Sequence, residues 1–203
     1  YQLNVIDAAR LDVRGGFIPA DRPIQLREGW NLSAYFPRQP IPADVALAAI
    51  VDNLFIAKDG LGRFYLPEFG FNNMGNLQAG QGYQYNMREA DELVYQVGEQ
   101  VALASRDTSN PEHFGVLTPT GTDMSILLTG NPQMSGMEIG IFTSGGRLVG
   151  SGVFNQNGNC GVAVWGDDVT TDEVDGTVEG EALTFVLWNG AEEFAVSPEP
   201  ITG

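Results

Sequence analysis

Apolar and polar residues alternate along most of this chain, and this period of two is typical of half-buried β-strands. In the first half, stretches rich in glycine and proline separate the alternating segments. Asp59-Gly60-Leu61-Gly62 lies between two of them and predicts a hairpin turn, because tight turns need glycine where φ is positive. We expect strands in this half at residues 24–26, 30–36, 54–57, 63–66, 82–87 and 93–97.

One segment departs from this alternation. The apolar residues of segment 45–51 would nearly surround a helix of that length, so the segment predicts a short buried helix. Asp44 precedes it and belongs to the residue types that cap helix N-termini. The first half of the chain is therefore expected to form a small β-rich module with one helix.

From about residue 106 the pattern contains strands and turns but no helix. Asn157-Gly158 and Asn189-Gly190 are strong hairpin signals, since both central residues of a type I′ turn need positive φ. Near-regular strand spacing predicts an antiparallel β-sandwich or jelly roll, so the whole chain is expected to be mainly β. The strands are expected at residues 124–128, 138–142, 148–154, 160–165 and 183–188.

The first residues of the chain have a counterpart further on. Tyr1-Gln2-Leu3-Asn4-Val5 is similar to Tyr83-Gln84-Tyr85-Asn86-Met87, and Leu11 matches Leu93 at the same offset. This similarity indicates an internal repeat. The alternative is chance similarity between two amphipathic strands.

The repeat divides the chain into three expected regions. Residues 1–16 are the end of a preceding repeat, residues 17–105 are a β-rich repeat module with one helix, and residues 106–203 are an antiparallel β-sandwich. Because the sequence opens without Met, we expect a mature or excised piece of a longer protein. Residues 1–16 should then form strands that pair as residues 83–98 do, or leave an edge open for a neighbouring chain.

Charge excludes some classes of partner. The 203 residues include 26 acidic and 10 basic ones, for a formal net charge of −16. Nucleic-acid binding and docking on anionic lipid both need clustered Lys and Arg, so neither is expected. The sequence also has no apolar run long enough to insert into a membrane. Such an acidic chain suits a saline extracellular setting; the alternative is an acidic surface without particular meaning.

A resemblance adds context to these patterns. Gly29-Trp30-Asn31-Leu32, the segment 52–59 and the segment 76–83 resemble a repeat in large secreted proteins of Bacteroidota-type bacteria. The segments 138–142 and 165–181 are similar to a β-sandwich module that often accompanies it. Such proteins commonly end in a type IX secretion sorting domain. The resemblance implies export, attachment to or release from the cell surface, and no catalysis.

Candidate chemistry is limited to sugar binding and calcium. Trp165 and Trp188 end strands that we expect to be neighbours, and Asn189 follows directly. Aromatic faces stack on pyranose rings while amides bind hydroxyls, so these residues are candidates for a sugar site. Their position off the most apolar strand face predicts exposure; the alternative is that both tryptophans fill the core. His113 is the sole histidine, and no motif for nucleophilic catalysis is present, so no catalytic residue is expected.

The acidic segment 167–176 is the candidate metal site. Its carboxylates repel one another unless cations or hydrogen-bond donors compensate them, and calcium binds six to eight oxygens of this kind. The expected ligands are Asp167, Asp168, Asp172 and Asp175. The alternative is a solvated acidic turn. Calcium with a structural role is the one cofactor that the sequence suggests.

Taken together, these features predict a non-catalytic extracellular module for cell-surface attachment or polysaccharide binding. The alternative is a structural building block of a surface filament or layer, which assembles through its own modules. The expected partners are accordingly a polysaccharide, a cell-surface component or copies of the same chain.

Overall fold

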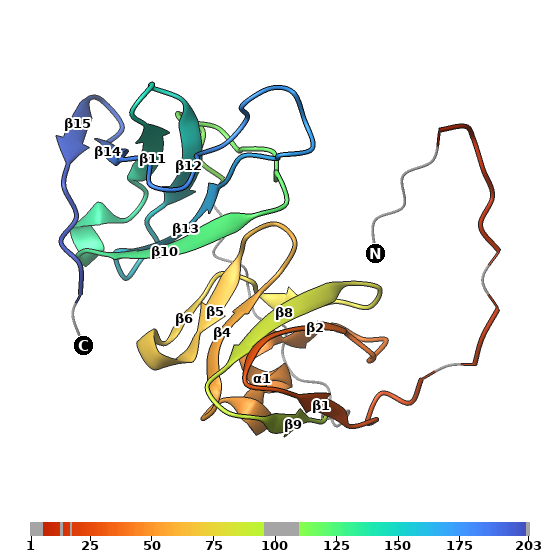
Figure 1. Cartoon of the computed structure of the whole chain (residues 1–203). Coiled ribbons are helices and arrows are strands. Elements are labelled where there is room, and N and C mark those ends of the chain that lie inside the picture. Colours follow the sequence, from red (N-terminus) through yellow and green to blue (C-terminus); the bar gives the residue numbers. More distant parts are fainter. Residues whose placement is uncertain (1–5, 13, 17, 96–109, 202–203) are drawn as a thin grey trace.

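The computed structural model describes residues 6–12, 14–16, 18–95 and 110–201, and its regular structure is mainly β. Figure 1 shows two compact units, which we call the first unit (residues 18–95) and the second unit (residues 110–201). The predicted fold class, a small β-rich module with a short helix followed by an antiparallel sandwich, is confirmed. The expected boundary between residues 105 and 106 lies outside the described residues.

The first unit is built on a five-stranded antiparallel sheet with the order β2-β8-β4-β5-β6, beside the short pairs β1-β9 and β3-β7. Its strands are β1 (Ile24–Leu26), β2 (Gly29–Ala34), β3 (Ile41–Pro42), β4 (Leu54–Lys58), β5 (Phe64–Leu66), β6 (Phe71–Asn72), β7 (Asn76–Leu77), β8 (Gly82–Met87) and β9 (Asp91–Leu93). The 3₁₀ turn η2 (Pro67–Phe69) connects β5 to β6.

The helix is shorter and starts earlier than expected. Helix α1 (Ala43–Ala46) is followed by the 3₁₀ turn η1 (Ala48–Ile50), so the predicted continuous helix over 45–51 is wrong. Pro42 occupies the N-cap position without a side-chain cap, and Asp44 lies within the first turn. The start is set by β3, because Ala43 N donates to Gly75 O at 2.9 Å directly after the β3-β7 pair. No helix in the described part of the chain is long and apolar enough to span a bilayer.

The five-stranded sheet buries both faces of β4 and β5, which explains the apolar density of these two strands. Ala57 and Tyr65 point into the core of the first unit, which also contains Tyr85 and Tyr95, whose hydroxyls lie 3.0 Å apart. The alternate residues, Ile56, Phe64 and Leu66 with Phe71 of β6, form a separate cluster on the other face. That face packs against the second unit.

The second unit is a sandwich of a four-stranded sheet, order β12-β11-β14-β15, and the pair β10-β13. Its strands are β10 (Asp123–Thr129), β11 (Glu138–Thr143), β12 (Leu148–Val153), β13 (Asn159–Trp165), β14 (Leu183–Trp188) and β15 (Glu193–Val196), with the 3₁₀ turn η3 (Pro132–Met134) after β10. The core between the sheets centres on Ile139, Ile141, Val149, Val162 and Val164.

The two units are joined by a buried ion pair and an apolar contact. Lys58 at the end of β4 donates to Asp123 Oδ2 at 2.6 Å, and the two side chains are 7% and 12% exposed. Leu127 of β10 packs into the cluster of Ile56 and Phe64. The strand period thus directs Asp123 and Leu127 toward the first unit, whereas Met124 and Ile126 face the inside of the sandwich.

The N-terminal residues do not form the strands that the repeat predicts. Residues 6–12 and 14–16 are in no strand, and Leu11 is 69% exposed whereas its counterpart Leu93 is fully buried. The prediction of β9-like pairing at residues 9–11 is therefore wrong. In the complete repeat, Leu93 pairs with Ile24 of β1, and no described strand offers residues 9–11 an equivalent partner. The counterpart of β8, residues 1–5, lies outside the described residues.

Replacing Lys58 by Ala should leave Asp123 as an unpaired charge in the interface. We expect the free energy of unfolding to fall by about 3 kcal/mol, the usual cost of removing one member of a buried ion pair. Urea unfolding followed by circular dichroism measures this loss. The control is Arg88→Ala, because the Arg88–Glu68 pair is half exposed and its loss should cost less than about 1 kcal/mol. Equal effects of the two variants would contradict the prediction.

Candidate functional site

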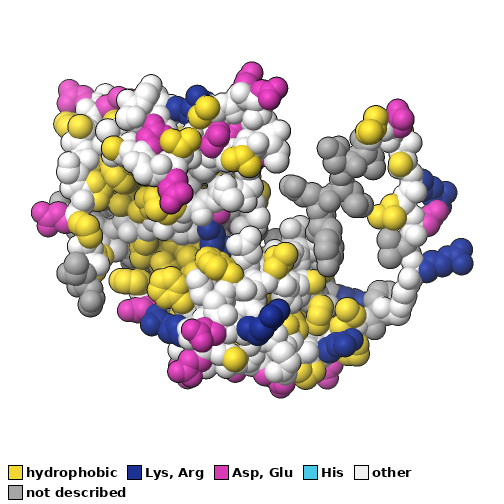
Figure 2. All heavy atoms as spheres, in the orientation of Figure 1, with side chains coloured by type: hydrophobic (Ala, Val, Ile, Leu, Met, Phe, Trp, Pro, Cys, Tyr) yellow, Lys and Arg dark blue, Asp and Glu magenta, His cyan; other side chains and the backbone are white. Residues whose placement is uncertain are grey.

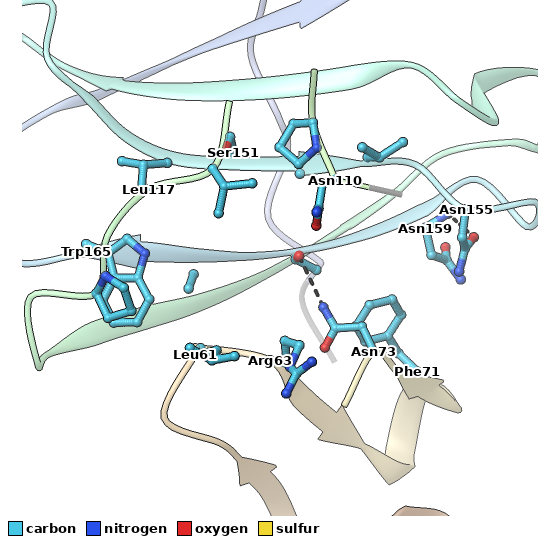
Figure 3. A pocket seen from close by; sticks show the side chains of 18 of the residues that line it. Leu61, Arg63, Phe71, Asn73, Asn110, Leu117, Ser151, Asn155, Asn159 and Trp165 are labelled. Atoms are coloured by element: carbon cyan, nitrogen blue, oxygen red, sulfur yellow. Dashed lines mark hydrogen bonds between the residues drawn. The ribbon is translucent and has the colours of Figure 1, made fainter. Parts of the chain in front are cut away.

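A cleft of about 390 Å³ lies where the two units meet. Figure 3 shows that its floor and walls come from separate parts of the chain. Leu61 and Arg63 come from the turn between β4 and β5, and Asn73 follows β6. The second unit contributes residues of β12 and β13. The connector of residues 110–119 forms the upper side of the cleft in the view of Figure 3. The cleft therefore exists only when both units are docked.

The turn that carries Arg63 is held by Asp59. Asp59 Oδ1 accepts hydrogen bonds from Leu61 N at 2.9 Å and Arg63 N at 3.0 Å. Arg63 Nε donates to Asp59 Oδ2 at 2.6 Å, so the guanidinium charge is already compensated within the turn. Arg63 thus presents hydrogen-bond donors to the cleft without an unbalanced charge.

Glycines allow the units to approach at the back of the cleft. Gly62 has φ +75°, and a Cβ at this position would lie 2.3 Å from Ala163 Cβ. A Cβ on Gly161 would lie 2.5 Å from the Phe71 ring. Because real Cβ contacts are never that short, any larger residue at either position must push the units apart.

Asn73 joins the two units by hydrogen bonds. Its Oδ1 accepts from Phe64 N at 2.7 Å, and its Nδ2 donates to Gly161 O at 3.3 Å across the junction, the contact drawn as a dashed line in Figure 3. Neighbouring Asn72 is also engaged, since its Oδ1 accepts from Met74 N and Gly75 N. These two amides are structural parts of the wall.

Three other amides in the cleft keep hydrogen-bonding capacity. The side chains of Asn110 and Asn159 form no hydrogen bond to any residue that the structure describes. Asn155 Oδ1 accepts from Asn157 N and Asn159 N, each at 3.0 Å, and this leaves the Nδ2 donors of Asn155 for other partners. Figure 3 shows Asn155 and Asn159 side by side at one end of the cleft and Asn110 nearer its middle.

A buried carboxylate fixes the connector that carries Asn110. Glu138 of β11 is 8% exposed and accepts backbone N–H groups of Glu112, His113 and Phe114 at 2.9–3.2 Å. Ser151 of β12 adds a bond from its hydroxyl to Gly115 O at 2.6 Å. No cation is needed, because three amide donors compensate the charge. The connector is thereby held against the outer face of the four-stranded sheet.

Trp165 lines the cleft, but its ring is 7% exposed, so the predicted exposure of this residue is wrong. Strand parity does direct it away from the core of the second unit, as Val162 and Val164 occupy that core. The Asp59–Arg63 turn of the first unit covers it instead, and a Cβ on Gly62 would lie 3.1 Å from the ring. The alternation of a single strand shows which face a residue occupies but not whether another unit covers that face.

The other two predicted sugar-binding residues lie elsewhere. β13 pairs with β10 whereas β14 pairs with β11 and β15, so Trp165 and Trp188 are not on neighbouring strands and the expectation that they share a site is wrong. The His113 ring stacks on Trp188 with centroids 3.9 Å apart. Asn189 Oδ1 accepts from Ala191 N and Glu192 N at 2.9 Å and closes the β14–β15 turn.

The acidic segment is closed by its own hydrogen bonds. Asp175 N donates to Asp167 Oδ1 at 2.8 Å, and Asp168 N donates to Asp175 Oδ1 at 2.9 Å. The hydroxyl and the backbone N–H of Thr170 both donate to Asp168 and lower the pKa of its carboxyl. Asp172 is exposed in the same loop. Among the described residues, no three His, Cys, Asp or Glu side chains are grouped so that they could hold a metal.

No sequence pattern pointed to the residues that line the cleft. Asn155, Asn159, Asn110, Asn73 and Arg63 come from four segments, and none belongs to a recognisable motif. Asparagine density in Phe71-Asn72-Asn73 and Asn155-Gln156-Asn157 was an available signal, but asparagine is also a common turn residue. The described residues that line the cleft include no Asp, Glu, His or Cys. They offer a ligand hydrogen bonds and apolar contacts.

Glu138→Gln should loosen the connector. The amide keeps one oxygen acceptor but loses the charge and the second acceptor, so we expect a loss of about 1–3 kcal/mol in the free energy of unfolding. Limited proteolysis should also cut residues 110–117 faster. Glu179→Gln, at an exposed position, is the matched control and should change stability by less than about 0.5 kcal/mol. Unchanged stability and proteolysis in Glu138→Gln would contradict this role.

Calcium binding by segment 167–175 stays a prediction. If the segment binds calcium, millimolar calcium should raise the midpoint of thermal unfolding, and excess chelator should reverse the rise. The reason is that a ligand of the folded state stabilises the folded state. Asp175→Asn retains Oδ1 as the acceptor for Asp168 N but removes a charge, so it should abolish the calcium effect while the loop stays closed. An unchanged midpoint in the original sequence would leave a loop closed by hydrogen bonds alone.

Comparison of the chain with protein-family models, with curated proteins and with solved structures finds no match in any of the three.

Proposed function

We propose that this chain is a non-catalytic extracellular module that binds a neutral polysaccharide in the cleft between its two units. The observation that carries the proposal is one cleft that contains the unengaged side-chain amides of Asn110 and Asn159 together with the remaining Nδ2 donors of Asn155. The amides of Asn110 and Asn159 offer both donors and an acceptor, which suits the paired donor and acceptor character of sugar hydroxyls, and Asn155 adds donors. Binding sites of this kind combine a few oriented polar groups with apolar walls.

The apolar part of the cleft supports the same ligand class. Two apolar side chains of the lining, Leu61 and Val116, are 60% and 69% exposed. The C–H faces of pyranose rings pack on such surfaces while their hydroxyls bond to the amides. A cleft with both kinds of lining favours a sugar over a purely apolar ligand.

Charge favours a neutral polysaccharide over an anionic one. The chain has a net charge of −16, and the one charged side chain of the described lining, Arg63, is already paired with Asp59. A polyanion would therefore be repelled without a local cation to compensate it. Uncharged hydroxyl-rich chains meet no such cost. The acidic surface and the resemblance to modules of secreted proteins support an extracellular or cell-surface setting.

Removal of two cleft amides should weaken binding of neutral polysaccharides. We expect the double variant Asn110→Ala/Asn159→Ala to raise the dissociation constant about tenfold or more, since each lost hydrogen bond contributes about 1 kcal/mol. A glycan array identifies the ligand, and affinity electrophoresis in gels that contain it measures the change.

The matched control is Gln84→Ala, which removes an exposed amide from β8, outside the cleft. It should bind as the original chain does. The original chain binding no neutral glycan, or equal weakening by the control, would overturn the proposal. Anionic glycans should bind weakly or not at all.

A further inference from the structure

The sandwich of the second unit is sealed on one side and open on the other. At the centre, Val162 and Ile141 are fully buried. Burial decreases toward the outer strands, where Ile126 of β10 and Phe185 of β14 are only half-buried and Met124 is 51% exposed. We call this region the apolar seam; its residues, all on the inner faces of the two sheets, are Met124, Ile126, Leu128, Phe185, Leu187 and Val196.

Glycines on the sealed side account for the opening. A Cβ on Gly150 would lie 2.9 Å from Val162 Cγ1, and one on Gly152 would lie 2.6 Å from Cys160 Sγ. The two sheets therefore approach closely along β12 and β13 and diverge toward β10 and β15. Figure 2 shows hydrophobic side chains gathered on the surface of the second unit at the side of β10 and β15.

The strands that border the apolar seam have free edges within the described part of the chain. β10 pairs only with β13, and β15 pairs only with β14. An edge strand with unpaired N–H and C=O groups accepts a further strand, and a half-buried apolar face beside it contributes binding energy to the added side chains. The seam therefore has both features of a strand-addition site.

The same chain carries a segment suited to that site. We call residues 6–18 the N-terminal arm; its described residues extend away from the body in Figure 1, and Ile6 and Leu11 are 101% and 69% exposed. Apolar residues alternate in its sequence at Leu11, Val13 and Phe17, with polar Asp12 and Arg14 between them. In an extended conformation the apolar three share one face.

Charge decides which segment of another copy can dock. Residues 110–201 contain thirteen Asp and Glu against Arg147 alone, so two second units repel each other. The N-terminal arm contains two Arg and two Asp and is formally neutral. It can therefore approach the acidic second unit of another copy without that repulsion.

We propose that the apolar seam is an interface between copies of this chain, in which the N-terminal arm of one copy adds as a strand along β10 of the next. Leu11 would face Ile126 and Leu128 of the receiving copy. Arm and seam are different surfaces, so the contact is head-to-tail and extends from copy to copy. This contact is separate from glycan binding. It is the kind of contact through which a structural building block would assemble.

Sedimentation equilibrium of the full chain over a range of concentrations tests the contact. We expect reversible association that Leu11→Asp weakens about tenfold or more, since burial of one Leu contributes about 1.5–3 kcal/mol. Ala8→Asp adds the same charge to the opposite face of the extended arm and is the matched control, with an expected change of less than about threefold. Both positions are exposed, so neither variant should disturb folding. A chain that stays monomeric at millimolar concentration would overturn the proposal.

Disulfide trapping locates the contact. Copies with Gly15→Cys, a position on the same face of the extended arm as Leu11, are mixed with differently tagged copies with Met124→Cys, or with Val174→Cys as a control of matched exposure (52% against 51%). We expect a cross-linked heterodimer with Met124→Cys and at least about tenfold less with Val174→Cys. Native Cys160 does not compete, because burial raises the pKa of its thiol to about 12.

Two outcomes would overturn the assignment. One is equal cross-linking to both tagged copies. The other is an intrachain disulfide in monomers of the double variant Gly15→Cys/Met124→Cys, which would mean that the arm covers its own seam. None of these substitutions touches the cleft, so a failure of glycan binding and a failure of arm addition are separately observable.

Discussion

The pairing of Lys58 with Asp123 is the constraint on which the arrangement of this protein depends. Lys58 is the sole lysine of the chain, and its ammonium lies between the two units, bonded to the first residue of β10 and 5.9 Å from the centroid of the Trp30 ring. A desolvated ion pair of this kind is a weak source of stability but a strong determinant of register, because a displaced partner would leave a buried charge. It therefore selects one docked orientation of the units.

Everything proposed for the cleft follows from that orientation. The apolar cluster around Phe64 and Leu127 supplies the attraction, and Gly62 and Gly161 supply the close approach. The cleft lies between residues that both units contribute. Asparagines from both units reach it. The binding surface is thus a consequence of docking rather than a property of either unit.

The acidic residues are held without many cations. Glu138 and Asp168 are compensated by backbone and hydroxyl donors, and Asp59 by both amides and Arg63. Amide donors are available in every loop, whereas this chain has 10 basic residues for 26 acidic ones. The same imbalance leaves a surface that repels anions and other copies of itself, except through segments that carry little net charge.

The period of the sequence determined the strands, the mainly β class and the face of each strand, because side-chain alternation is a local property. The Asn-Gly pairs marked the positions of two turns, but only their glycines have positive φ, so the expected type I′ geometry is wrong. The period also placed Trp165 off the core of its own sandwich. What covers that residue, and whether Trp188 lies near it, depended on strand pairing and on the docking of a second unit. The cleft asparagines were likewise unpredictable, since an asparagine that closes a turn and one that faces a ligand have the same sequence. Only the tertiary structure decided these points, because they rest on contacts between residues far apart in the chain.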